Sequence, residues 1–141
     1  YSAPFLFGDR LIHIDVNAVE GIYTVDANSD FYRGHFKERP VTPGVILTEC
    51  CAQIGLVCLG IHLLGKNHAA SDTEDLPMAF SSAAMDFYAP VWPGETVRVV
   101  AEKEYFRFHK LKCKVQLFNA KGKLACRGKL SGMFKTEKNE K

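Results

Sequence analysis

A histidine, a glycine and a glutamate that could do acid–base chemistry occur within 15 residues of the chain. His35 lies in a polar segment, Gly44 follows Pro43, and Glu49 comes five residues after Gly44. Histidine is the side-chain type that accepts a proton near neutral pH. Backbone N–H groups at the start of a helix lack an intrahelical acceptor, and the helix dipole there favours negative charge. We therefore take this stretch as the candidate centre of chemistry.

Together these residues suit the elimination of water from the carbon β to a carbonyl group. His35 would take the α-proton, and the N–H of Gly44 would stabilise the charge that develops on the carbonyl oxygen. A buried carboxyl without a nearby cation keeps its proton near neutral pH, so Glu49 would protonate the departing hydroxyl.

The helix that carries Gly44 and Glu49 is predicted to run from Gly44 to Leu64, with Thr42 as N-cap and Pro43 at the first helical position. Its only polar side chains are Thr48, Glu49, Gln53 and His62. A helix that is apolar on every side is buried in a core or in a membrane. Its length suits a bilayer, but Glu49 and Gln53 would then lie in hydrocarbon. We expect a core helix and no membrane association.

Patterns of alternation predict strands around this helix. We expect them at 12–16 and 22–27, with a turn at Glu20-Gly21, then at 80–91, 96–104, 105–118 and from Leu124 onwards, with turns at 92–95 and 119–122 and a polar loop at 65–77. One helix and an antiparallel meander predict a single α+β domain over residues 1–134, in which a curved sheet wraps the helix. Residues 135–141 would form a charged tail. One such sheet cannot cover all the apolar surface, so we expect subunits to associate.

Composition and charge exclude several classes of protein. The chain has 141 residues, 47% of them hydrophobic, and a formal net charge of +2, which is typical of one globular domain and too small to argue for nucleic acid. Residues 1–97 carry 5 Lys/Arg against 12 Asp/Glu, and residues 98–141 carry 13 against 4, so the second part could attract an acidic macromolecule. Neither the histidines nor the five cysteines show metal-ligand spacing, and no secretion signal is visible, so we expect no metal and a cytoplasmic protein.

The pattern GHF-x3-PVTPGV-x3-E-x3-Q, from Gly34 to Gln53, resembles the 3-hydroxyacyl-[acyl carrier protein] dehydratase family. The resemblance extends from PFLFGDR at 4–10 to FYAPVWPGE at 87–95. It implies the hot dog fold, in which a curved antiparallel sheet wraps one long central helix. It also implies a homodimer or higher homo-oligomer with active sites shared between subunits, and no cofactor.

The resemblance further implies a role for each site residue. His35 from one subunit would be the base, oriented by the backbone carbonyl of Val41, and Glu49 from the other subunit would be the acid. The Gly44 N–H would bind the thioester carbonyl, and Gln53 would belong to the polar network of the site. An acidic acyl carrier protein would deliver the acyl chain, on its phosphopantetheine arm, into an apolar tunnel along the helix.

The sequence departs from the family pattern at three places: Lys37-Glu38-Arg39 follows His-Phe, Thr42 replaces the usual Met, and Asp86-Phe87-Tyr88-Ala89 replaces a basic run. These changes bear on the carrier docking surface and the substrate rather than on the reacting groups. Two alternatives stay open. A hot dog acyl thioesterase would need Glu49 but not His35, and a non-catalytic acyl-carrier-binding subunit would need neither as a catalyst.

Overall fold

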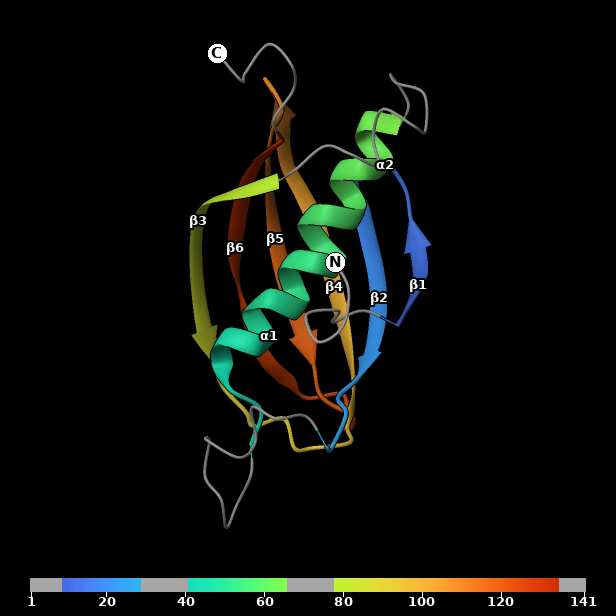
Figure 1. Cartoon of the computed structure of the whole chain (residues 1–141), viewed down its shortest axis with the longest axis vertical. Coiled ribbons are helices and arrows are strands. Elements are labelled where there is room, and N and C mark those ends of the chain that lie inside the picture. Colours follow the sequence, from blue (N-terminus) through green and yellow to red (C-terminus); the bar gives the residue numbers. More distant parts are fainter. Residues whose placement is uncertain (1–8, 29–40, 66–77, 135–141) are drawn as a thin grey trace.

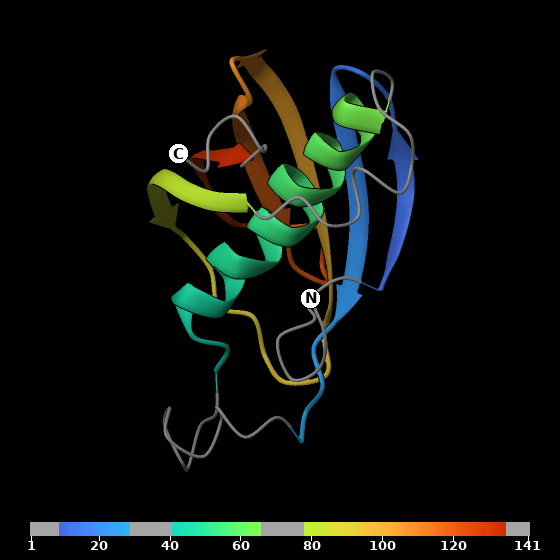
Figure 2. The same ribbon diagram turned by 45° about the horizontal axis from the view of Figure 1, so that its top comes forward.

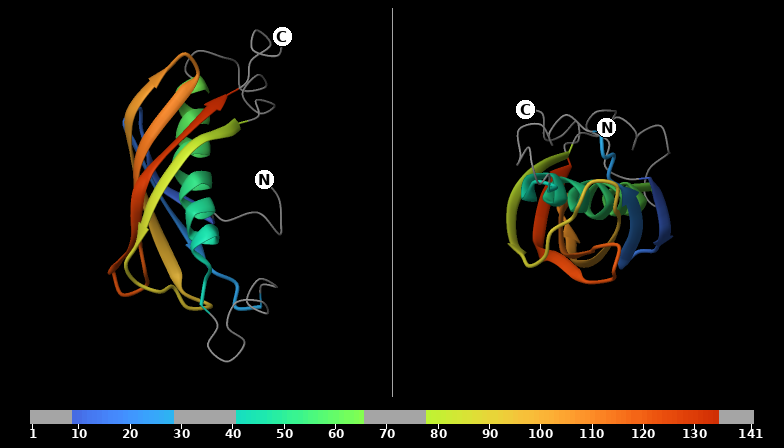
Figure 3. Two further views of the ribbon diagram at one scale, coloured as in Figure 1. Left: turned by 90° about the vertical axis from the view of Figure 1, so that its left-hand side faces the viewer. Right: turned by 90° about the horizontal axis from the view of Figure 1, so that it is seen from below.

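The computed structural model describes residues 9–28, 41–65 and 78–134, which form one helix lying on a curved antiparallel sheet (Figure 1). In this part of the chain the sheet has six strands in the order β1-β2-β4-β5-β6-β3. The strands are β1 (Arg10–Ile14), β2 (Ala18–Thr24), β3 (Met78–Phe87), β4 (Thr96–Arg107), β5 (Lys110–Phe118) and β6 (Leu124–Phe134). Viewed along the long axis of the molecule, the sheet curves around the helix, as expected from the sequence (Figure 3).

The predicted core helix is confirmed to within one residue at its C-terminal end. It consists of α1 (Gly44–Cys51), a π-helical segment η2 (Ala52–Cys58) and α2 (Leu59–Gly65). Its length and apolar composition would also allow it to cross a membrane. However, Leu47, Ile54 and Leu59 are at most 4% exposed in the core formed with the sheet. This burial is the pattern of the core helix of a globular domain.

Close contact between helix and sheet depends on two glycines. A Cβ atom on Gly55 would lie 3.1 Å from Cβ of Ala101 on β4. A Cβ atom on Gly21 of β2 would lie 2.8 Å from Cγ2 of Ile54. The absence of side chains at Gly21 and Gly55 therefore lets the two layers approach closely.

The prediction of a turn at Glu20-Gly21 is wrong, because both residues lie within β2. The chain turns at Asp15 instead, where the carboxylate accepts the backbone N–H groups of Asn17 and Ala18 at 2.7 and 2.9 Å. A short acidic side chain that binds the backbone two or three residues ahead stabilises such a turn. The first two strands therefore lie two to four residues before their predicted positions.

The prediction of a strand from Tyr105 to Phe118 is also wrong, because a hairpin divides this range. Phe108 and His109 link β4 to β5 with φ values of 53° and 59°. Two-residue hairpins with a type I′ turn need positive φ at both central positions, which Asn and Gly usually supply. The turns predicted at 92–95 and 119–122 are confirmed, with Gly94 at φ 86° and Gly122 at φ 78°. The first residue of the loop predicted at 65–77, Gly65, is the last residue of α2. The rest of this loop and the predicted tail lie outside the described residues.

The alternation predicted for β5 is confirmed. Leu111, Cys113, Val115 and Leu117 are at most 1% exposed and face the helix. The lysines between them lie on the outer face of the sheet, where Lys114 is exposed. The central strands thus have one apolar face toward the helix and one charged face toward solvent.

Candidate active site

The segment that leads into the helix is held by the chain that follows β3. The backbone N–H of Thr42 donates to the carbonyl of Val91 at 2.8 Å, and Thr42 is 4% exposed. The prediction of Thr42 as N-cap is wrong by one residue. Pro43 is the N-cap, since its ψ of 143° is not helical and its carbonyl accepts the N–H groups of Ile46 and Leu47. The helix therefore begins at Gly44, where we expected a carbonyl-binding N–H.

Gly44 lies against the ring of Phe87, the last residue of β3, and Figure 1 shows α1 beginning beside the end of this strand. Figure 2 shows the same helix lying across the hollow side of the sheet. A Cβ atom on Gly44 would lie 3.1 Å from both Cε1 and Cζ of Phe87. Carbon atoms in contact prefer about 3.5–4.0 Å, so the contact leaves little room for a side chain. As a residue of the first helical turn, Gly44 has an N–H without an intrahelical acceptor. This N–H can bind an anion or a polarised carbonyl oxygen.

Glu49 and Gln53 form a hydrogen-bonded pair on the same helix. Nε2 of Gln53 donates to Oε1 of Glu49 at 3.1 Å, across one helical turn. Gln53 is 5% exposed, whereas Glu49 is half-buried rather than buried as the sequence suggested. Gln53 lies in η2, and π-helical segments occur often at functional sites. The buried amide thus orients a carboxyl that is still partly accessible.

The helix places two chemically useful groups at a defined separation. Gly44 and Glu49 are five residues apart, about 7.5 Å along the axis of an α-helix. Gly44 provides an N–H at the positive end of the helix dipole, and Glu49 provides a carboxyl group. Such a pair can bind a carbonyl oxygen and act by acid or base catalysis on a substituent of a nearby carbon atom.

His35, the predicted base, lies outside the described residues. Val41, whose carbonyl was expected to orient it, is half-buried directly before Thr42. The structure therefore brings Gly44, Glu49 and Gln53 together on one helix and leaves the role of His35 a prediction.

The thiols near Glu49 are poor nucleophiles. Burial raises the pKa of Cys50 far above its usual range, and a hydrogen bond to Cys126 together with burial raises the pKa of Cys51. Both thiols therefore stay protonated, and a protonated thiol neither attacks carbonyl carbon nor binds metal well. Over 9–28, 41–65 and 78–134, no three His, Cys, Asp or Glu side chains converge as a metal site would require.

Sequence reasoning did not identify Phe87 as part of the site. Its motif was noted, but nothing in the alternation of β3 indicates that its ring would reach Gly44, which is 43 residues away in the chain. The ring reaches the start of the helix because β3, the edge strand of the sheet, pairs with β6. Phe87 is 50% exposed although its ring lies against Gly44, so the ring can contact a molecule that binds at the start of the helix.

Comparison with known proteins gives consistent results at the level of sequence. Residues 2–131 match the model of the FabA-like domain family. The 3-hydroxyacyl-[acyl-carrier-protein] dehydratase FabZ of Rickettsia akari is 33% identical over 134 residues, which cover 94% of this chain and 87% of the relative. The FabZ dehydratase of Wolbachia sp. subsp. Brugia malayi is 32% identical over 119 residues, which cover 84% of this chain and 77% of the relative.

Solved structures show the same architecture at lower identity. The dehydratase heterocomplex ApeI:P from Xenorhabdus doucetiae matches with a TM-score of 0.76 and 14% identity, covering 99% of this chain and 89% of that chain. A thioesterase superfamily member from Thermus thermophilus matches with a TM-score of 0.63 and 17% identity, covering 97% and 88%. These similarities confirm the hot dog fold predicted from the sequence.

Proposed function

Because the chain belongs to the FabA-like family that includes the FabZ 3-hydroxyacyl-[acyl-carrier-protein] dehydratases, we propose that it removes water from 3-hydroxyacyl thioesters carried on acyl carrier protein. The product is the trans-2-enoyl thioester. One observation from the structure supports this proposal most directly. The N–H of Gly44, which has no acceptor within the helix, and the Glu49 carboxyl lie on one element, with Gln53 orienting the carboxyl.

In the proposed mechanism, His35 removes the proton from the α-carbon of the substrate. The electron pair of that C–H bond forms the new double bond, and transient negative charge on the thioester oxygen is stabilised by the Gly44 N–H. The bond between the β-carbon and its hydroxyl breaks, and Glu49 gives that hydroxyl a proton, so that water leaves. The net change is loss of one water, and proton exchange with solvent returns His35 and Glu49 to their starting states.

The remaining site residues support this arrangement. Gln53 holds the Glu49 carboxyl through the 3.1 Å hydrogen bond, which fixes the direction of proton transfer. The carbonyl of Val41 orients the His35 ring. The backbone hydrogen bond from Thr42 to Val91 holds in place the residue that follows Val41.

We further propose that two chains form a homodimer in which each site takes His35 from one subunit and Glu49 from the other. β3 is an edge strand of ten residues, and Phe80 and Phe87 on it are each 50% exposed. A long edge strand presents unpaired N–H and C=O groups, and pairing with its own copy would satisfy them. Because β3 ends at Gly44, such a dimer would bring a second chain next to the site.

We place the reaction in the cytoplasm. Cys50, Cys51, Cys58, Cys113 and Cys126 are all free thiols, and burial raises the pKa of Cys113 to about 12. Free buried cysteines are typical of proteins from a reducing compartment.

The test is turnover of 3-hydroxyacyl thioesters on carrier protein and on a small thiol, with enoyl thioester and free thiol measured separately. His35→Ala and Glu49→Gln should each lower enoyl formation by about 10²-fold or more. The matched controls are His13→Ala and Glu102→Gln, which change exposed residues on β1 and on the outer face of β4. Both controls should keep the activity of the unchanged protein on the small thiol substrate.

Two results would contradict the proposal. Thiol release that survives His35→Ala would indicate a thioesterase. No product from any substrate, together with tight binding of the acyl carrier, would indicate a non-catalytic subunit.

A further inference from the structure

The outer face of β5 and β6, which points away from the helix, is basic. From Tyr105 to Phe134 the chain has eight Lys or Arg residues and no Asp or Glu. Strands β5 and β6 fall in this range and pair with each other in the centre of the sheet. Their apolar side chains face the helix, so Lys114, Arg127 and Lys129 are exposed on the outer face.

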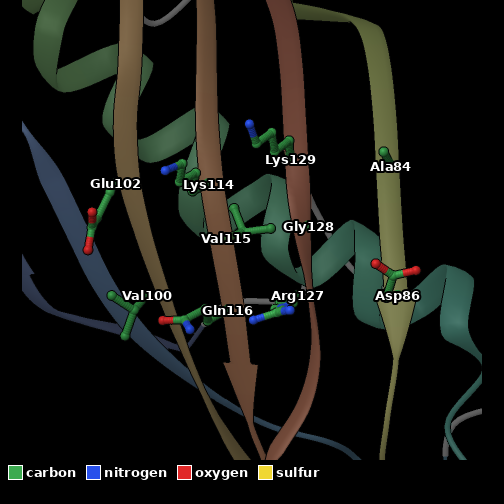
Figure 4. A pocket seen from close by; sticks show the side chains of 10 residues that line it. All are labelled: Ala84, Asp86, Val100, Glu102, Lys114, Val115, Gln116, Arg127, Gly128 and Lys129. Atoms are coloured by element: carbon green, nitrogen blue, oxygen red, sulfur yellow. The ribbon is translucent and has the colours of Figure 1, made fainter.

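These cations line a hollow on that outer face, which we call the outer groove. Its volume is about 490 Å³, and it lies across β3, β4, β5 and β6, with the helix behind the sheet (Figure 4). Lys114, Gln116, Arg127 and Lys129 occupy its centre, while Glu102 on β4 and Asp86 on β3 lie at its two sides. Small or branched residues, including Ala84 and Val100, also line it.

The registers of the strands explain why positive charge collects in the centre. Lys114 pairs directly with Lys129, and Gln116 pairs with Arg127. Like charges directly opposite each other on a sheet repel. Glu104 offsets part of this repulsion, with its carboxylate 3.0 Å from Nζ of Lys129 and 3.9 Å from Nζ of Lys114. The hydrogen bond from Lys129 also lowers the pKa of Glu104, so this carboxylate stays charged.

The Glu104 carboxylate lies near three lysines, because Nζ of Lys112 is also 3.8 Å from it. Arg127 is held differently: its Nε donates to Oη of Tyr88 at 3.2 Å, and its guanidinium lies over the Tyr88 ring. Across the flanking strands Lys114 also pairs with Glu102, and Arg127 pairs with Asp86. Three cations therefore line the groove against two carboxylates, and the cations lie in its centre, where an anionic partner would contact them.

The outer groove and the candidate active site lie on two sides of the same strand end. Asp86 faces the groove, whereas the next residue, Phe87, contacts Gly44 at the start of the helix. Tyr88 then follows, and its backbone N–H donates to Ala125 of β6 at 2.7 Å. The end of β3 therefore separates the basic groove from the Gly44 N–H by the thickness of one strand.

We propose that the acyl carrier protein docks on the outer groove, with acidic side chains of a carrier helix against Lys114, Arg127 and Lys129. This inference rests on the proposed function, which makes an acidic carrier the natural partner. Glu102 and Asp86 at the sides would repel a continuous phosphate backbone, so the groove suits a short acidic helix better than a nucleic acid. Docking there places the pantetheine arm beside the end of β3, from which it can pass Phe87 to reach Gly44.

Binding of a fluorescently labelled phosphopantetheinylated carrier protein, without an acyl chain, tests this proposal. Lys114→Gln combined with Lys129→Gln should weaken the carrier Kd about ten-fold at low salt and flatten its salt dependence. The matched control is Lys121→Gln combined with Lys123→Gln, which removes the same charge from the exposed β5–β6 hairpin. The control should bind almost as well as the unchanged protein. Arg127→Gln, which leaves Glu104 and its lysines intact, provides a second variant should the first fail to fold.

Kinetics separate docking from chemistry. The groove variants should lower kcat/KM about ten-fold for the carrier-bound substrate and leave it unchanged for the same acyl group on a small thiol. Equal losses in groove and hairpin variants, unchanged carrier binding in the groove variants, or equally tight binding of an unrelated protein of the same negative charge would overturn the docking proposal. Failure of the unchanged protein to dehydrate either substrate would overturn the proposed function instead, and the binding measurement would still decide the docking surface.

Discussion

Replacing Gly44 with alanine would test whether the start of the helix and the ring of Phe87 must keep their present spacing for activity. The new Cβ would lie 3.1 Å from Cε1 and Cζ of the ring, closer than the roughly 3.5–4.0 Å that carbon atoms prefer. Helix start and ring must therefore separate by a few tenths of an ångström. Since a misplacement of about 1 Å costs about 10²-fold in rate, this smaller shift predicts about a ten-fold loss of kcat.

The same substitution should leave the fold almost unchanged. Phe87 is 50% exposed, so its ring can tilt toward solvent instead of straining the core. Alanine is also a better helix former than glycine by about 1 kcal/mol. We expect the melting temperature to change by less than about 4 °C, which separates a local effect on the site from unfolding.

The assay is kcat for a 3-hydroxyacyl group on a small thiol, which avoids any contribution from carrier docking. Phe87→Leu should restore most of the loss when combined with Gly44→Ala, because leucine lacks the two crowded ring atoms, and the two single variants complete the cycle. Val45→Ala, at a neighbouring residue that is 76% exposed, is the control for a change on the same turn. Full activity of Gly44→Ala, or no recovery in the double variant, would refute the argument.

Three further substitutions give separate tests. Gly128→Ala would place a Cβ atom 2.0 Å from the carbonyl oxygen of Ala84, so β3 must move away from β6; we expect a loss of about 1–3 kcal/mol in the free energy of unfolding, measured with urea, and an unchanged midpoint would contradict the close contact. Gln53→Leu removes the donor to Oε1 of Glu49, and kcat for the small thiol substrate should fall about ten-fold while the protein stays folded; unchanged kcat would show that the pair has no role in orientation. Asp15 has a pKa lowered from 3.8 to about 2 by its hydrogen bonds to His13 and the turn, so its stabilising effect is present above 3.8 and lost as the pH falls toward 2. Asp15→Asn should therefore lose stability relative to the unchanged protein near neutral pH but not at the acid end, as chemical denaturation at the two pH values would show.

The parts of the fold that the sequence predicted are those in which local pattern and tertiary structure agree. The helix from Gly44 onwards is apolar on all sides, and only a central position in the core accommodates that pattern. The alternation along β5 follows from the lysines between its apolar residues, although the predicted strand begins at Tyr105 instead of Lys110. The errors occur where a residue has a different role from its usual one: Gly21 allows the helix to approach the sheet instead of forming a turn, and Phe108 and His109 adopt positive φ without glycine.

The same distinction between local pattern and long-range contact applies to the candidate site. The spacing of Gly44, Glu49 and Gln53 determines their relation, because residues on one helix keep fixed positions relative to each other. Phe87 reaches the site only through the pairing of β3 with β6, and such a long-range contact has no signal in the local sequence. The charges of the outer groove follow a similar rule, since the sequence showed a basic second part but not that Lys114 and Lys129 pair across two strands.

The partial exposure of Glu49 bears on how the enzyme is assembled. The proposed mechanism needs Glu49 to reach the hydroxyl of the substrate, and closing an active site expels the water that would compete there. Within the described residues Gln53 contributes a hydrogen bond to Glu49, yet the side chain stays half-buried. In the proposed dimer, a second subunit paired along β3 would lie next to this end of the helix and cover more of Glu49. The proposed dimer would then supply both the His35 of the other chain and the cover that excludes water from Glu49, so the two proposals depend on the same contact.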